Sequence, residues 1–142
     1  MKTIVPKIEP QDRKWFVVDL DGVTMGRVAV QVANILRGKN KPIFSPHLDN
    51  GDNIIAVNAG GMRFTGRKVY QKKYFHHSGY PGGLREVSLE RMMARMPDRV
   101  FTLAVKRMLP KNRLGRKALK KLHVYAGASH PHAAQKPEKL EL

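Results

Sequence analysis

The segment 110–127, PKNRLGRKALKKLHVYAG, holds the densest positive charge in the sequence. Its basic residues recur at positions i, i+3, i+4 and i+7 of a helix, so they share one face. The four residues of this face are Arg113, Arg116, Lys117 and Lys120, with Lys121 at its margin. Neighbouring Cβ atoms on such a face are about 5–6 Å apart, a spacing that can engage successive phosphates. We therefore expect a helix that docks through its leucines and presents a cationic ridge.

Two other interpretations of this helix are possible. A lysine-rich face can simply be solvated, but such faces usually mix Glu with Lys to form i,i+4 pairs, and this one contains no acid. A basic amphipathic helix can also lie on anionic lipid. Here the apolar side includes Gly115 and Ala118 and no Trp or Phe that could anchor it. The pattern therefore favours binding to a polyanion.

A second basic segment, 66–77, reads GRKVYQKKYFHH. Its cations alternate with Tyr70, Tyr74 and Phe75, and aromatic rings can stack on exposed bases in RNA complexes. Alternatively, the rings point into the core of a hairpin within 64–74 whose turn lies near Gly66. Under either interpretation we expect the lysines of this segment to contact a partner.

Histidines and serines offer little sign of catalysis. His76 and His77 are adjacent, so on a strand they point to opposite faces, and neither they nor His130 and His132 belong to a metal-ligand pattern. No serine lies in a G-x-S-x-G motif. We expect no catalytic residue and no metal; polar contacts with RNA or with backbone suit these histidines better.

The segment 17–30, VVDLDGVTMGRVAV, has the outline of a nucleotide-binding strand, turn and helix. A dinucleotide loop requires G-x-G-x-x-G, whereas three residues separate Gly22 from Gly26, and Ala29 stands where a third glycine would follow. No G-x-x-x-x-G-K-[ST] motif is present either. We expect no cofactor here, Thr24 as the helix N-cap, and Arg27 as the one side chain that reaches RNA.

The excess charge is segregated along the chain. Of the 142 residues, 27 are Lys or Arg and 11 are Asp or Glu, which gives a net charge of +16. Two acid-free windows, 53–85 and 99–137, hold 16 of the basic residues, and the rest of the chain is neutral. This segregation favours a binding surface for a polyanion over general solubility.

Composition excludes several protein classes. The absence of Cys rules out disulfides, zinc–thiolate sites and iron–sulfur clusters and favours the cytoplasm. No apolar run reaches the roughly 18 residues of a membrane helix, and the first residues do not resemble a signal peptide. The chain length suits a single domain over 1–142, with an N-terminal extension at 1–13.

Hydrophobic periodicity places the elements that must position these residues. Buried strands are expected at 15–19, 53–58 and 122–125, and a helix at 25–36. Ser88, Asp98 and Asn112 each start a further helix, with Pro97 and Pro110 as breaks. Residues 126–142 lack periodicity and are expected to be a surface tail. Strands that alternate with helices predict an α/β sandwich around a small, mostly parallel sheet.

The segment 105–127, VKRMLPKNRLGRKALKKLHVYAG, closely resembles the signature of the family of large-subunit ribosomal protein thirteen, bacterial type. WFVVDLDGVTMGRVAV, YFHHSGYPGGL and YAGASHPHAAQKP resemble other family segments in the same order. The resemblance implies a three-layer α/β/α fold with a mainly parallel four-stranded sheet, basic loops and a C-terminal extension. It also implies a structural role without catalysis or cofactor: binding of large-subunit (23S-type) ribosomal RNA early in assembly.

The same resemblance implies a cytoplasmic ribosome as the location, and ribosomal RNA and neighbouring ribosomal proteins as partners, with no membrane and no small-molecule substrate. Arg107 departs from the family pattern, where Gly is frequent, and adds a charge. Matching positions and the charge pattern together predict these RNA-binding residues: Arg27, Lys39, Lys41, His47, Arg67, Lys68, Lys72, Lys73, His76, His77, Tyr80, Lys106, Arg107, Lys111, Arg113, Arg116, Lys117, Lys120, Lys121, His123, His130 and His132.

Overall fold

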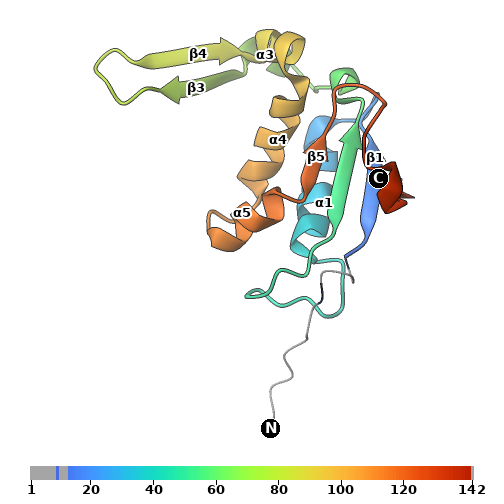
Figure 1. Cartoon of the computed structure of the whole chain (residues 1–142). Helices are drawn as coiled ribbons and strands as arrows, with labels where there is room; N and C mark the ends of the chain where they lie inside the picture. The colour runs from blue at the N-terminus through green and yellow to red at the C-terminus, as the bar shows by residue number, and fades with distance from the viewer. Residues whose placement is uncertain (1–8, 10–12, 142) are drawn as a thin grey trace.

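The computed structural model describes residue 9 and residues 13–141, and its centre is a four-stranded parallel sheet in the order β5-β2-β1-β6 (Figure 1). The strands are β1 (Trp15–Asp19), β2 (Asn53–Val57), β5 (Leu122–Val124) and β6 (Glu138–Lys139). The expected α/β fold with a four-stranded parallel sheet is confirmed, and the three strands predicted from hydrophobic runs agree with β1, β2 and β5 to within a residue. The expected N-terminal extension lies almost wholly outside the described residues.

Helices α1 (Met25–Arg37) and α4 (Pro97–Met108) pack against each other and against one face of the sheet. This face carries Phe16, Val18, Ile54 and Ala56, because alternate residues of a strand point to the same side. Phe101 of α4 is fully buried in this core. Burial of such a side chain contributes about 1.5–3 kcal/mol, so this layer provides the rigid support for everything that projects from it.

The helix ends mostly follow the signals in the sequence. Gly38 ends α1 in the left-handed region at φ 80°, where its N–H bonds to the carbonyls of Asn34 and Ile35. Ser88 caps α3 (Leu89–Arg95), and Asn112 caps α5 (Arg113–Leu119) by accepting the Gly115 N–H at 2.7 Å.

One cap prediction holds for the backbone only, and another is wrong. Thr24 occupies the N-cap position of α1 as predicted, but its side chain forms no capping hydrogen bond. Helix α4 begins one residue before Asp98, at Pro97, so Met96 occupies the N-cap position. Proline suits the first helical position because the N–H that it lacks would have had no partner there.

The hairpin expected within 64–74 is wrong in position. That stretch contains the short helix α2 (Lys68–Gln71), and the hairpin follows it as β3 (Lys73–His77) paired antiparallel with β4 (Leu84–Ser88). Its loop suits the turn because Gly79 (φ 92°) and Gly82 (φ 71°) adopt left-handed conformations that side chains disfavour. In Figure 1 the hairpin projects away from the body of the molecule.

The C-terminal tail is more regular than its sequence indicates. After the short 3₁₀ turn Ala133–Gln135, it adds β6 to the edge of the sheet, where Phe16 is in register with Glu138, and the Leu140 N–H bonds to the Val17 carbonyl at 2.8 Å. This pairing rests on backbone hydrogen bonds, which leave no hydrophobic pattern in the sequence. A second 3₁₀ turn, Ala59–Gly61, follows β2.

In the part of the chain that the structure describes, no helix is long and apolar enough to cross a membrane. The same residues contain no group of three or more His, Asp or Glu side chains that could hold a metal ion.

Candidate nucleic-acid interface

We define the ridge as the exposed basic residues at the end of α4, in the following turn and along α5 as far as its C-cap. They are Lys106, Arg107, Lys111, Arg113, Arg116, Lys117 and Lys120. Leu114 and Ala118 lie on the opposite, inward side of α5, as the helical spacing predicts. None of the seven forms a salt bridge with any residue that the structure describes. Their charges therefore remain available to an external anion.

Gly115 is required where α5 packs against the turn before it. A Cβ at this position would lie 1.9 Å from the carbonyl oxygen of Pro110, a distance that no side chain tolerates. This close packing holds the ridge at a set orientation to the end of α4.

Tyr74 joins the hairpin to the ridge. Its ring is buried, the Lys72 ammonium lies 5.3 Å from the ring centroid, and the Arg107 guanidinium lies 5.7 Å from it. Cations over an aromatic face are attracted by the ring quadrupole, so the two charges are brought close despite their repulsion. Burial lowers the pKa of Lys72, and the positive charges of Arg107 and Lys68 lower it further. The cations of the hairpin base are therefore continuous with the ridge.

The other aromatic rings of this region are not in a core. Phe75 is 63% exposed and Tyr80 is 76% exposed, and Tyr70 is also exposed. A two-stranded hairpin is marginal in water without a surface to pack against. These exposed rings are thus free to stack on unpaired bases. Of the three rings in the segment 66–77, only Tyr74 is buried, as the alternative interpretation expected.

The two faces of the hairpin differ in charge. His76 is in register with Arg85 on one face, whereas Lys73 lies on the other and bonds to the carboxylate of Glu86 at 3.1 Å. His77 shares the face of Lys73, and its Nδ1 accepts the N–H of Gly79 at 2.9 Å. Arg85 therefore gives the face that it shares with His76 a positive charge, and the sequence analysis missed Arg85 although it lies in an acid-free window.

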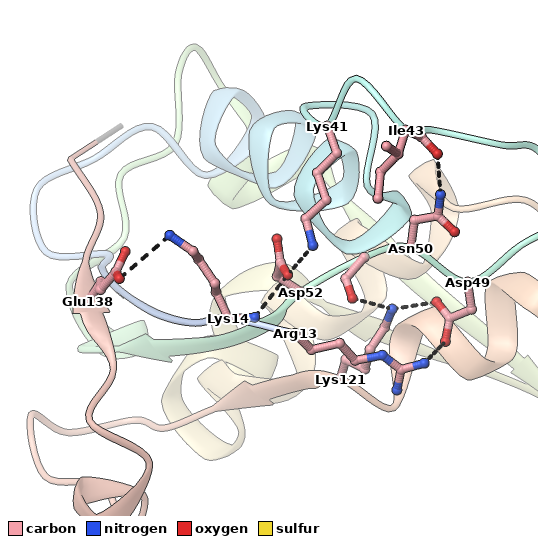
Figure 2. Close-up of polar contacts among 10 residues, drawn as sticks. Arg13, Lys14, Lys41, Ile43, Asp49, Asn50, Asp52, Lys121 and Glu138 are labelled. Carbon is pink, nitrogen blue, oxygen red and sulfur yellow. Dashed lines mark hydrogen bonds and ion pairs between the residues drawn. The ribbon is translucent and has the colours of Figure 1, made fainter. Parts of the chain in front are cut away.

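Lys121 and Lys41 do not present free charges at the surface, because each pairs with a carboxylate of the protein. Figure 2 shows the Lys121 ammonium between the Asp49 carboxylate, which also binds Arg13, and the carbonyl of Gly51 at 3.0 Å. Lys121 is only 6% exposed, and burial lowers its pKa while Asp49 opposes that shift. We call Arg13, Lys41, Asp49, Asp52 and Lys121 the ion network; Asp52 and Lys121 are buried, and the other three are half-buried.

The Lys41 ammonium pairs with Asp52 at 2.6 Å, and Asp52 is buried. The backbone N–H of Lys14 also donates to Asp52 at 3.0 Å. This network ties the start of β1, the 39–52 loop and the start of β5 together at one end of the sheet. Both lysines were predicted to bind RNA, and we leave both out of the interface because their charges are already compensated inside the protein.

The C-terminal histidines form an aromatic cluster on the other face of the sheet. His123 stacks on Trp15 with ring centroids 5.6 Å apart, and His132 lies 4.6 Å from His123. The hydroxyl of Tyr125 and Nε2 of His132 are 2.7 Å apart. Burial lowers the pKa of His123, and the nearby His132 lowers it further. His130 stacks at the margin of the cluster, which joins the tail to β1 and β5.

The remaining predicted residues are exposed and dispersed. Lys39 and His47 lie in the loop after α1, Arg27 lies in the first turn of α1, and Arg67 and Lys68 lie at the start of α2. Arg63 was not predicted, yet the structure places it against the start of α1, where its backbone bridges to Thr24. Its position in an acid-free window was the signal that could have identified it.

Comparison with known proteins shows the family to which the chain belongs. Residues 13–131 match the family model of ribosomal protein L13. The chain is 57% identical over 142 residues to the large ribosomal subunit protein uL13 of Nitratidesulfovibrio vulgaris, which spans 100% of this chain and 99% of the relative. It is 57% identical to the protein of the same name from Symbiobacterium thermophilum, over 99% of both chains, and 56% identical to that from Aquifex aeolicus, over 100% and 99%. The chain belongs to the ribosomal protein L13 family, whose members are structural, non-enzymatic constituents of the ribosome.

Proposed function

We propose that this protein binds large-subunit (23S-type) ribosomal RNA early in assembly of the cytoplasmic ribosome and stabilises the fold of that RNA. Residues 1–142 act as one unit in this role, beside neighbouring ribosomal proteins. The observation that carries the proposal is the ridge: seven exposed cations on adjoining elements, without a carboxylate partner among the described residues.

Electrostatics explains why such a surface needs an anion. Two like charges about 6 Å apart in water repel by about 0.7 kcal/mol, and ridge residues three or four positions apart on α5 are neighbours on one helix face. This cost is small for each pair, but it has no internal compensation. Phosphates along an RNA backbone would remove the repulsion and release the counterions condensed on the RNA.

Phosphate contacts by the ridge would supply most of the affinity, and the shape of the folded RNA would supply specificity. The exposed rings of Phe75 and Tyr80 on the projecting hairpin add a second mode, because base stacking on an aromatic ring contributes about 1–3 kcal/mol per base. The hairpin would then pack against RNA or a neighbouring protein.

The dependence of binding on salt tests the RNA interface. If roughly 8–12 phosphates are neutralised, log K falls with log salt at a slope of about −6 to −11. The measurement is a filter-binding or anisotropy titration with 23S-type RNA between low and moderate salt. A slope shallower than about −3 contradicts the proposal that the ridge is an RNA footprint.

Early assembly is tested separately, by the order of addition. We expect the purified protein to bind protein-free 23S-type RNA and to remain bound during sucrose-gradient sedimentation at moderate salt. If stable binding requires other ribosomal proteins to be present first, the early role is wrong even though the RNA interface holds.

A further inference from the structure

A cavity of about 370 Å³ lies at the start of α1, at the strand–helix turn that has the outline of a nucleotide-binding turn without its glycine spacing. Its walls come from the first residues of α1, from residues 63–65 and from α2 with Lys72. The Met25 N–H bonds to the Arg63 carbonyl at 3.1 Å, and the Arg63 N–H bonds to the Val23 carbonyl at 2.9 Å. These backbone bonds hold two walls in place, so the cavity is built into the fold.

The lining of the cavity combines positive charge with an apolar surface. Arg63, Lys68 and Lys72 contribute three cations, the lining contains no carboxylate, and none of the three forms a salt bridge within the described residues. Phe64 supplies an aromatic wall. Such a lining suits an anion that is attached to a flat, partly apolar body, and the volume is at the lower end of the roughly 300–1,000 Å³ typical of ligand pockets.

Gly26 keeps the cavity open. A glycine inside a helix costs about 1 kcal/mol relative to alanine, and packing does not require one here, because a Cβ at Gly26 would meet nothing within 4 Å. Gly115 is the contrast, since backbone packing there excludes any side chain. Because Gly26 lines the cavity, a longer residue at this position would occupy the space without disturbing the core.

We propose that this cavity receives one nucleotide of the bound ribosomal RNA, with its phosphate held by Arg63, Lys68 and Lys72 and its base against Phe64. The inference rests on the proposed RNA-binding function and adds a discrete site to it. The site lies beside the hairpin base, where Lys72 also faces Tyr74, so an RNA strand on the ridge reaches it along continuous positive charge.

The test fills the cavity with a side chain. Gly26→Met in the full chain is expected to weaken binding to 23S-type RNA about tenfold, with an unchanged or higher melting temperature because a helical glycine is replaced. Gly127→Met is the matched control: its Cβ also meets nothing within 4 Å, but Gly127 does not line the cavity, so RNA affinity should stay within twofold.

The outcomes separate this inference from the proposed function. If wild type fails to bind the RNA with a steep salt slope, the proposed function itself is wrong. If wild type binds and Gly26→Met binds equally well at the same melting temperature, the RNA interface stands and the nucleotide site is overturned.

Crosslinking identifies the occupant. Ultraviolet irradiation of the wild-type complex, followed by mass spectrometry, is expected to yield a nucleotide adduct within residues 63–72 that is lost in Gly26→Met. Adenosine monophosphate is the probe for a free nucleotide as the occupant. If it binds with micromolar affinity while no RNA adduct forms, the cavity takes a free nucleotide and the RNA seat is excluded.

Discussion

Lys117 and Lys121 are four residues apart in the sequence but lie in opposite environments. Lys117 is exposed on the ridge with no carboxylate partner among the described residues, whereas Lys121 is buried and bonded to Asp49. Helix α5 ends at Leu119 and the chain enters β5 at Leu122, so the helical repeat no longer applies to Lys121. The backbone path between them turns one lysine outward and the other inward.

The ion network and the ridge differ in the same way as these two lysines. The ion network matches its cations with Asp49 and Asp52, and it joins segments far apart in the sequence. The ridge has no internal anion, and it lies on two adjoining helices and the turn between them. Residue type and local density of charge therefore do not predict which cations are compensated inside the protein; the position of a partner carboxylate does.

The largest effect is expected from breaking the network. Lys121→Met leaves Asp49 with Arg13 alone, and removal of one member of a buried ion pair costs several kcal/mol. We expect a loss of about 3 kcal/mol in the free energy of unfolding and roughly 10 °C in melting temperature. Thermal denaturation followed by circular dichroism measures this. Lys117→Met, the matched control, should change stability by no more than about 0.5 kcal/mol.

Removing charges from the ridge should weaken RNA binding and leave the free energy of unfolding unchanged. Arg116→Gln with Lys117→Gln is expected to weaken RNA binding roughly 30-fold, since one charge-assisted contact at an exposed site contributes about 1 kcal/mol. The magnitude of the salt slope should fall by about 1.4–1.8. Binding titrations and thermal melts on the same preparation test both statements. An equal loss of stability would mean that these two side chains are structural.

The aromatic cluster predicts a pH effect on stability. Because the pKa of His123 is lowered in the fold by burial and by His132, the unfolded chain binds a proton more readily. The stability contribution is therefore complete above the ordinary histidine pKa of about 6.5 and is lost as the pH falls below it. The melting temperature should fall as the pH is lowered from about 7.5 to about 5, and this fall should be smaller in His123→Phe. A wild-type melting temperature that rises on acidification would contradict this.

The smallest effect is expected at the hairpin, where Lys73 is a predicted RNA-binding residue that already has a carboxylate partner. Glu86→Gln releases Lys73 from an exposed pair, and such pairs contribute about 0–1 kcal/mol. We expect a change in stability below about 0.5 kcal/mol and a gain in RNA affinity of about twofold to threefold. Competition binding against wild type has the precision to detect this. Unchanged affinity would place Lys73 away from the RNA.

The fold was largely predictable because its signals are local. The buried runs at β1 and β2, the apolar stripe of α1 and the caps at Ser88 and Asn112 all depend on residues close in sequence. The misplaced hairpin has the opposite cause. β4 reads LREVS, with one apolar residue at each end of a charged pair, and its strand forms through pairing with β3 rather than through burial.

The sequence also identified the ridge, because acid-free windows and helical spacing are visible without coordinates. The sequence did not identify Arg63 and Arg85 as members of the basic surface, and it did not identify the cavity at Gly26. These features depend on segments brought together from different elements. Lys41 is a similar case, because the sequence did not indicate its pairing with Asp52, at the other end of the same loop. Figure 2 shows this pair.

Most of the elements, the family and the excess of positive charge follow from the sequence alone, because periodicity, motifs and composition are properties of contiguous residues; the hairpin and β6 do not. Only the tertiary structure decided which cations are compensated. Whether a lysine meets a carboxylate depends on where distant segments pack, as with Lys121 and Asp49, and burial then makes that meeting obligatory. The tail is a second case: its histidines and β6 become ordered because β1 offers them an open edge and an aromatic surface.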